Sequence, residues 1–159
     1  MSGTDTFVTG SEDETSAAGA RFAARLRAGD VVLLYGQLGA GKTAFVRGLA
    51  GGLGAQADEV TSPTFTLIQE YRGSNNRIRL FHVDLYRLRP EEVMGLGLEE
   101  LTDGAPVVAI EWAERLSDPP DAWMVRIDDE GDDRRRISIV APPPRPHAGA
   151  EVVDPAAAD

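Results

Sequence analysis

The residues from 36 to 43 have types and a spacing that can bind phosphate. They follow the pattern G-x-x-x-x-G-K-T, a loop whose backbone N–H groups cradle nucleotide phosphates. Lys42 is the only lysine in the chain, and the other basic residues counted with it are arginines. A compact ammonium on a flexible stem suits a narrow loop better than a planar guanidinium. The pattern predicts a phosphate site made by Gly36, Gln37, Leu38, Gly39, Ala40, Gly41, Lys42 and Thr43.

The sequence around this loop supports the prediction. An apolar run at residues 31–35 predicts a buried strand before the loop, and residues 43–50 predict a helix after it. That helix would direct the positive end of its dipole at the phosphates. The Thr43 hydroxyl is then placed to bind Mg²⁺.

Two acidic residues are candidates for a further metal ligand or a catalytic acid. Glu111 follows the apolar run 107–110, and Asp84 follows the run 80–83. A strand-end acid can also simply face solvent, but in a P-loop protein one such carboxylate usually reaches the metal. His82 shares a strand face with Asp84, where it could orient a water or a ligand, although a lone strand histidine is more often structural.

Two other features near the motif are less specific. Thr64 ends a Thr-Ser-Pro-Thr segment that could sense the third phosphate as a switch-like loop, or could be a simple turn. Trp112, next to Glu111, is expected in the core or at an interface rather than beside the nucleotide.

The remaining pattern predicts one α/β domain over residues 1–141. Ser11, with Glu14 three residues later, predicts a helix start, and small residues extend that helix to about residue 28. A further helix is expected from Pro90 to about Leu101, weakened by two glycines. Residues 107–110 predict a central strand. Antiparallel hairpins are expected at the edges of the sheet from residues 65–71 with 77–84, and from residues 123–127 with 136–140.

Composition limits the possible partners and compartments. The net charge is -10 and there are no cysteines. A protein that binds nucleic acid unaided usually has a basic face. The one arginine cluster, at residues 134–136, follows five acidic residues within 128–133 and is expected at a solvated hairpin end. Unaided binding of RNA or DNA is therefore not expected. The start of the chain has neither the basic nor the apolar segment of a signal peptide. The absence of cysteines is consistent with a cytoplasmic protein. The Pro/Ala-rich residues 142–159 are expected to be a disordered tail.

Four segments together are similar to one bacterial family. They are the loop from Tyr35 to Thr43, Ser-Pro-Thr-Phe-Thr-Leu at residues 62–67, His-Val-Asp-Leu-Tyr-Arg-Leu at residues 82–88, and Ile-Glu-Trp at residues 110–112. In this order they resemble the TsaE (YjeE) family, the ATPase subunit of tRNA threonylcarbamoyladenosine (t6A) biosynthesis. The resemblance implies a P-loop NTPase-like α/β domain with a mixed sheet flanked by helices.

The resemblance also implies an activity and a set of roles. It implies Mg²⁺-dependent ATP binding and slow hydrolysis, stimulated by the transferase subunit and its inactive paralogue (TsaD and TsaB type). Residue by residue, Lys42 would hold the β- and γ-phosphates, Thr43 and Glu111 would bind Mg²⁺, and Asp84 would be a metal ligand or catalytic acid. Thr64 would belong to a switch-like loop. Ser11 and Thr15 would lie near the adenine.

Other functions fit parts of the same pattern. A nucleotide-gated assembly module would use the same loop, with hydrolysis incidental. A small-molecule kinase is compatible with the domain size, but no arginine-rich lid or acceptor-site insertion is visible. A GTPase is disfavoured because its Asn-Lys-x-Asp motif needs a second lysine.

Overall fold

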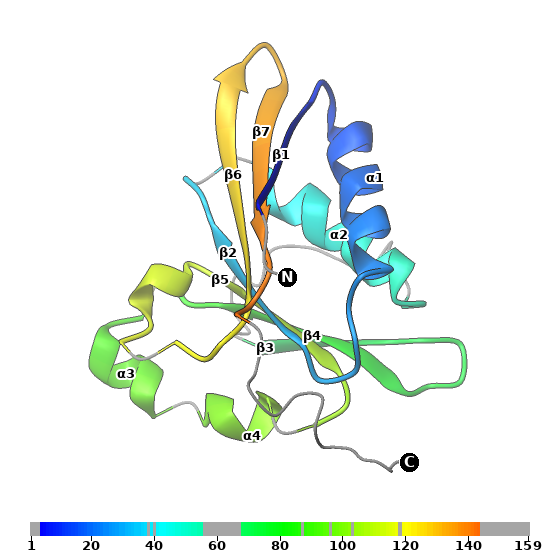
Figure 1. Cartoon of the computed structure of the whole chain (residues 1–159). Coiled ribbons are helices and arrows are strands. Elements are labelled where there is room, and N and C mark those ends of the chain that lie inside the picture. Colours follow the sequence, from blue (N-terminus) through cyan, green and yellow to red (C-terminus); the bar gives the residue numbers. More distant parts are fainter. Residues whose placement is uncertain are drawn as a thin grey trace.

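The fold is a seven-stranded mixed sheet covered by helices on both faces (Figure 1). The computed structural model describes residues 4–37, 39, 41–55, 68–86, 88–95, 97–102, 104–117 and 119–143. The strand order is β1-β7-β6-β2-β5-β4-β3. The strands are β1 (Thr4–Thr9), β2 (Val31–Tyr35), β3 (Ile68–Arg72), β4 (Ile78–Asp84), β5 (Val107–Glu111), β6 (Trp123–Gly131) and β7 (Arg134–Val140).

The centre of the sheet is parallel and its edges are antiparallel. Strand β2 is parallel to both β5 and β6, and β4 is parallel to β5. Strands β3 and β4 form a hairpin at one edge, while β6, β7 and β1 are antiparallel at the other. The α/β fold with a mixed sheet and antiparallel edge hairpins, predicted from the sequence, is therefore confirmed.

The helices divide the core into two parts. Helices α1 (Glu12–Ala23) and α2 (Lys42–Gly52) lie side by side on one face, and the short helices α3 (Pro90–Met94) and α4 (Leu98–Thr102) lie on the other (Figure 1). Because side chains alternate along β2, its even and odd residues serve different cores. Val32 and Leu34 pack under α1 and α2, whereas Val31 and Leu33 pack in the cluster that contains α3 residues.

Glycines allow α1 and α2 to approach each other closely. A Cβ on Gly48 of α2 would lie 1.7 Å from the Ser16 carbonyl oxygen, and one on Gly19 of α1 would lie 2.1 Å from the Phe45 carbonyl oxygen. Real Cβ atoms essentially never come within 3.0 Å of such atoms. The two helices therefore touch backbone to backbone, and this contact fixes α2 relative to α1.

Two predictions of helix extent are wrong. Helix α1 ends at Ala23 rather than near residue 28. The helix expected from Pro90 to Leu101 is two short helices, because Gly95 ends the first and Gly97 has a φ of 72°, which a continuous right-handed helix does not accommodate. The strand residues 65–67 and, beyond residue 143, the expected tail lie outside the described residues. None of the described helices is long and apolar enough to cross a membrane.

Candidate functional site

The carboxyl ends of three parallel strands bring the predicted functional residues together. The phosphate loop follows β2, Asp84 ends β4 and Glu111 ends β5. The register pairs Glu111 with Leu34 on one side and with Asp84 on the other. Because the carboxyl ends of parallel strands meet at one edge, residues far apart in the sequence become neighbours there, where α/β proteins bind ligands.

The loop has the backbone conformation that its glycines predict. Gly39 and Gly41 have φ values of 81° and 106°, a left-handed region that side chains other than glycine rarely adopt. Gly41 is the N-cap of α2, whose first residue is Lys42. Consequently the helix begins at the loop and presents its free N–H groups there. Leu38 and Ala40 lie outside the described residues.

Lys42 connects the two ends of the loop and is almost completely buried. Its Nζ donates a hydrogen bond of 2.5 Å to the Gly36 carbonyl oxygen and lies 4.1 Å from the centre of the Trp112 ring. Burial lowers the pKa of the Lys42 ammonium, while the nearby carboxylates of Glu111, Glu114 and Asp84 oppose that change. The three carboxylates therefore offset part, but not all, of the effect of burial on the ammonium.

Trp112 lies between the core and the phosphate loop. It is partly buried against the core on the α3 and α4 side, and it also contacts the Lys42 ammonium. The centres of the Tyr86 and Trp112 rings are 4.8 Å apart. Its own backbone is left-handed, with a φ of 61°.

The two acids differ in their surroundings. Glu111 is 3% exposed, and the distance from its Oε2 to His82 Nε2 is 2.5 Å. Asp84 is half-buried and accepts a hydrogen bond from the Tyr86 backbone N–H. Burial raises the pKa of Asp84, with a smaller contribution in the same direction from Glu111; the Tyr86 hydrogen bond, His82 and Lys42 act to lower it. His82 is fully buried, so it is not placed to contact a water in the cavity.

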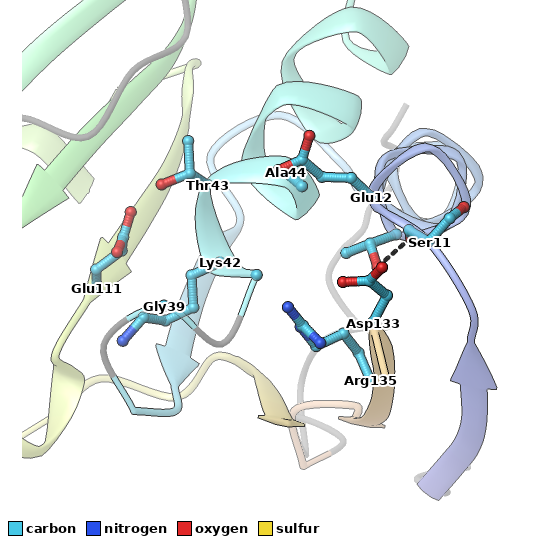
Figure 2. Close-up of a pocket in the computed structure, with 11 residues that line it drawn as sticks. Ser11, Glu12, Gly39, Lys42, Thr43, Ala44, Glu111, Asp133 and Arg135 are labelled. Atoms are coloured by element: carbon cyan, nitrogen blue, oxygen red, sulfur yellow. Dashed lines mark hydrogen bonds between the residues drawn. The ribbon is translucent and has the colours of Figure 1, made fainter. Parts of the chain in front are cut away.

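A cavity of about 460 Å³ lies over the start of α2 (Figure 2). It has room for a ligand of nucleotide size. Lys42, Thr43 and Glu111 lie toward one side in Figure 2, where the Thr43 side chain points toward Glu111. The lining residues come from the loop, the start of α2, the start of α1, β5 and the β6–β7 hairpin. They are Ser11, Glu12, Thr15, Gly39, Gly41, Lys42, Thr43, Ala44, Glu111, Asp133 and Arg135. Asp84 does not line this cavity.

The N-terminal residues of α1 form the opposite wall. Ser11 is the N-cap, and its Oγ accepts a hydrogen bond from the Glu14 backbone N–H at 3.1 Å. The buried Thr15 hydroxyl lies 2.7 Å from the Thr9 hydroxyl and donates to the Ser11 carbonyl oxygen at 3.1 Å. Both predicted residues therefore line the cavity. Thr64 lies outside the described residues.

The β6–β7 hairpin supplies cavity residues that were not predicted. Arg135 was expected at a solvated hairpin end, but its side chain is only 19% exposed and its Nε would lie 3.3 Å from a Cβ on Gly41. Asp133 and, from α1, Glu12 also line the cavity. No local pattern could have shown this, because it is the pairing of β7 with β1 that brings the hairpin next to α1.

Among the described residues, Thr43 and Glu111 offer oxygen atoms that could bind a divalent cation. No group of three or more His, Cys, Asp or Glu side chains is close enough to hold a metal among the residues that the structure describes. Mg²⁺ in nucleotide sites needs fewer, because one or two carboxylates act together with substrate phosphates and waters. Thr43 and Glu111 fit that chemistry.

Comparison with known proteins identifies the family of the chain. The family model of "Threonylcarbamoyl adenosine biosynthesis protein TsaE" matches residues 9–137. The chain belongs to the TsaE family. The TsaE protein of Nostoc sp. is 46% identical to it over 121 residues, which cover 74% of this chain and 73% of that protein. The TsaE protein of Bacillus subtilis is 41% identical over 131 residues, which cover 81% of this chain and 80% of that protein. Both are named tRNA threonylcarbamoyladenosine biosynthesis proteins.

A solved structure supports the fold. The crystal structure of B. subtilis YdiB matches with a TM-score of 0.69 and 37% sequence identity, covering 90% of this chain and 88% of that one. The resemblance to the TsaE family and the P-loop NTPase-like fold that it implied are therefore confirmed.

Proposed function

We propose that this chain is the ATP-binding and ATP-hydrolysing subunit of tRNA threonylcarbamoyladenosine biosynthesis, acting in the cytoplasm. Its membership of the TsaE family supports the pathway. The convergence of Lys42, Thr43 and Glu111 in one cavity at the end of the parallel strands supports the chemistry. Residues 1–141 form the proposed ATPase domain, and residues 142–159 a tail without an assigned role.

In the proposed mechanism the chain mainly positions and neutralises phosphate. Lys42, restrained by the Gly36 carbonyl, offers its ammonium to the β- and γ-phosphates, and the N–H groups of the loop hold the same oxygens. The Thr43 hydroxyl and Glu111 would hold Mg²⁺, with Asp84 as the second carboxylate beside them. When bound, the ion neutralises charge that develops on the phosphates. The water-activating group is either Asp84 or Glu111.

Adenine would lie toward the wall formed by α1 and the β6–β7 hairpin. Ser11 and Thr15 line that wall, and Arg135 and the carboxylates of Glu12 and Asp133 are also there. Carboxylate acceptors suit the amino group of adenine, and a guanidinium can stack on a base or bind phosphate.

We further propose that the ATPase cycle resets a partner complex rather than transferring the threonylcarbamoyl group itself. The partners would be a transferase subunit and its inactive paralogue of the TsaD and TsaB type. The net charge of -10 agrees with a subunit that reaches tRNA through such partners, because direct binding relies on displacing counterions with a basic face.

The test is Mg-ATP hydrolysis by the purified chain, alone and with the two candidate subunits and tRNA. Slow hydrolysis that the partners accelerate, and that Glu111→Ala abolishes, is the expected result. Partners that change neither hydrolysis nor nucleotide binding would contradict the proposal.

Glu111→Gln separates hydrolysis from assembly. If this variant assembles normally and supports tRNA modification over many turnovers, hydrolysis is dispensable, and the chain is a nucleotide-gated assembly module. Phosphorylation of an added nucleoside or shikimate-like acceptor would instead favour a small-molecule kinase.

A further inference from the structure

His82 is buried behind the candidate site and is hydrogen-bonded to one of its carboxylates. Its side chain is 0% exposed, and the distance from its Nε2 to Glu111 Oε2 is 2.5 Å. The register pairs His82 with Ala109, so the imidazole reaches diagonally to a residue two positions further along β5. The contact therefore connects a fully buried residue of β4 to Glu111, which lies at the end of β5 in the candidate site.

The surroundings of the two ring nitrogens indicate which of them carries the proton. Nδ1 is buried and has no hydrogen-bond partner among the described residues. An ionised carboxylate has only acceptor oxygens, so the hydrogen bond of 2.5 Å between Nε2 and Glu111 Oε2 requires a proton on Nε2. The proton therefore belongs on Nε2, and the imidazole donates to the Glu111 carboxylate.

This hydrogen bond restricts a side chain that would otherwise sample several conformations. A glutamate has three side-chain torsions, and ordering them costs conformational entropy. With Oε2 bound to a rigid, fully buried ring, the carboxylate of Glu111, which lines the cavity, is held before any ligand arrives.

We propose that His82 is a positioning residue that fixes the Glu111 carboxylate to receive a Mg²⁺–nucleotide complex. This inference rests on the proposed function, since it assigns Glu111 to the metal. A histidine with only a packing role explains less, because an apolar residue of similar size would fill the same space without burying two polar ring nitrogens. The feature that histidine provides here is the donor to Glu111.

The experiment is calorimetric titration of the chain with ATP, once with Mg²⁺ and once with EDTA. His82→Leu removes the donor and keeps an apolar side chain, whereas His82→Gln places an amide N–H close to the position of Nε2. Leu80→Val, on the same strand and also buried, is the matched control for a disturbed core. Thermal melting of each variant shows that it is folded.

The expected result is a selective loss of the effect of Mg²⁺. His82→Leu weakens ATP binding with Mg²⁺ by about 10- to 100-fold, the usual effect of removing a group that orients a metal ligand. Binding in EDTA stays the same. His82→Gln recovers most of the loss, Leu80→Val has wild-type binding in both buffers, and in a Glu111→Gln background His82→Leu causes no further loss.

Several results would overturn the inference. Equal binding by His82→Leu and wild type with Mg²⁺ would show that the contact is not used, and equal losses in His82→Leu and His82→Gln, or losses of the same size in EDTA, would show a purely structural role. If His82→Leu does not fold, His82→Asn replaces it, because its shorter amide cannot reach Glu111; Asn and Gln variants that bind alike would refute positioning. Wild-type chain that binds ATP equally with and without Mg²⁺ overturns this inference alone, whereas no ATP binding at all overturns the proposed function with it.

Discussion

Replacing Gly48 with alanine should destabilise the fold, although alanine is the better helix former. The new Cβ would lie 1.7 Å from the Ser16 carbonyl oxygen and 2.5 Å from its carbonyl carbon. Both atoms are backbone, so α1 and α2 must separate by roughly 1 Å or more, at an overpacking cost of about 3 kcal/mol. The gain in helix propensity returns about 1 kcal/mol. The net loss is about 2 kcal/mol, or a fall in Tm of about 4–8 °C for a domain of this size.

The assay is thermal and urea unfolding of Gly48→Ala beside Gly51→Ala. Gly51 is on the same helix and is exposed, so alanine there is expected to add helix propensity, and the Tm of Gly51→Ala should be unchanged or higher. Because Lys42 begins α2 while Ser11 and Thr15 belong to the start of α1, Gly48→Ala should also weaken ATP binding. A Gly48→Ala protein at least as stable as Gly51→Ala would refute the backbone-to-backbone contact.

Three further predictions concern the site and its walls. Asp84→Asn should raise the Tm at pH 7 but not at pH 4. Burial raises the pKa of Asp84, so the folded state disfavours the ionised carboxylate. This loss of folding free energy develops only as the pH rises above the ordinary carboxyl pKa, and asparagine avoids it. Ser11→Ala should lower the free energy of unfolding by about 1 kcal/mol in urea titrations, because the cap to the Glu14 N–H is lost. Arg135→Gln should weaken ATP binding about tenfold or more, because a charged hydrogen bond contributes about 1.5–3 kcal/mol. Arg126→Gln, an exposed position on the same hairpin, should bind ATP as the wild type does. If calorimetry gives Arg135→Gln the same affinity for ATP as the wild type, Arg135 is excluded from the nucleotide site.

Features encoded in short stretches of sequence were predictable. The phosphate loop, its glycines with positive φ, the Ser11 cap and the two edge hairpins each depend on residues within a few positions of one another. The placement of Asp84 and Glu111 at strand ends followed from apolar runs that end in an acid. The ends of two helices were predicted wrongly, although the two glycines that break one of them were noted in the sequence. Gly95 and Gly97 divide the expected helix, and α1 ends at Ala23.

The sequence by itself determined the phosphate loop and the class of fold, because local backbone preferences and hydrophobic periodicity specify them. Only the tertiary structure decided which distant groups share the site. The parallel register of β4 and β5 placed Asp84 beside Glu111 and let His82 reach that carboxylate. The antiparallel pairing of β7 with β1 brought Arg135 to the loop. These contacts join residues of different strands, and their distances depend on strand order and register, which no single segment of the chain encodes.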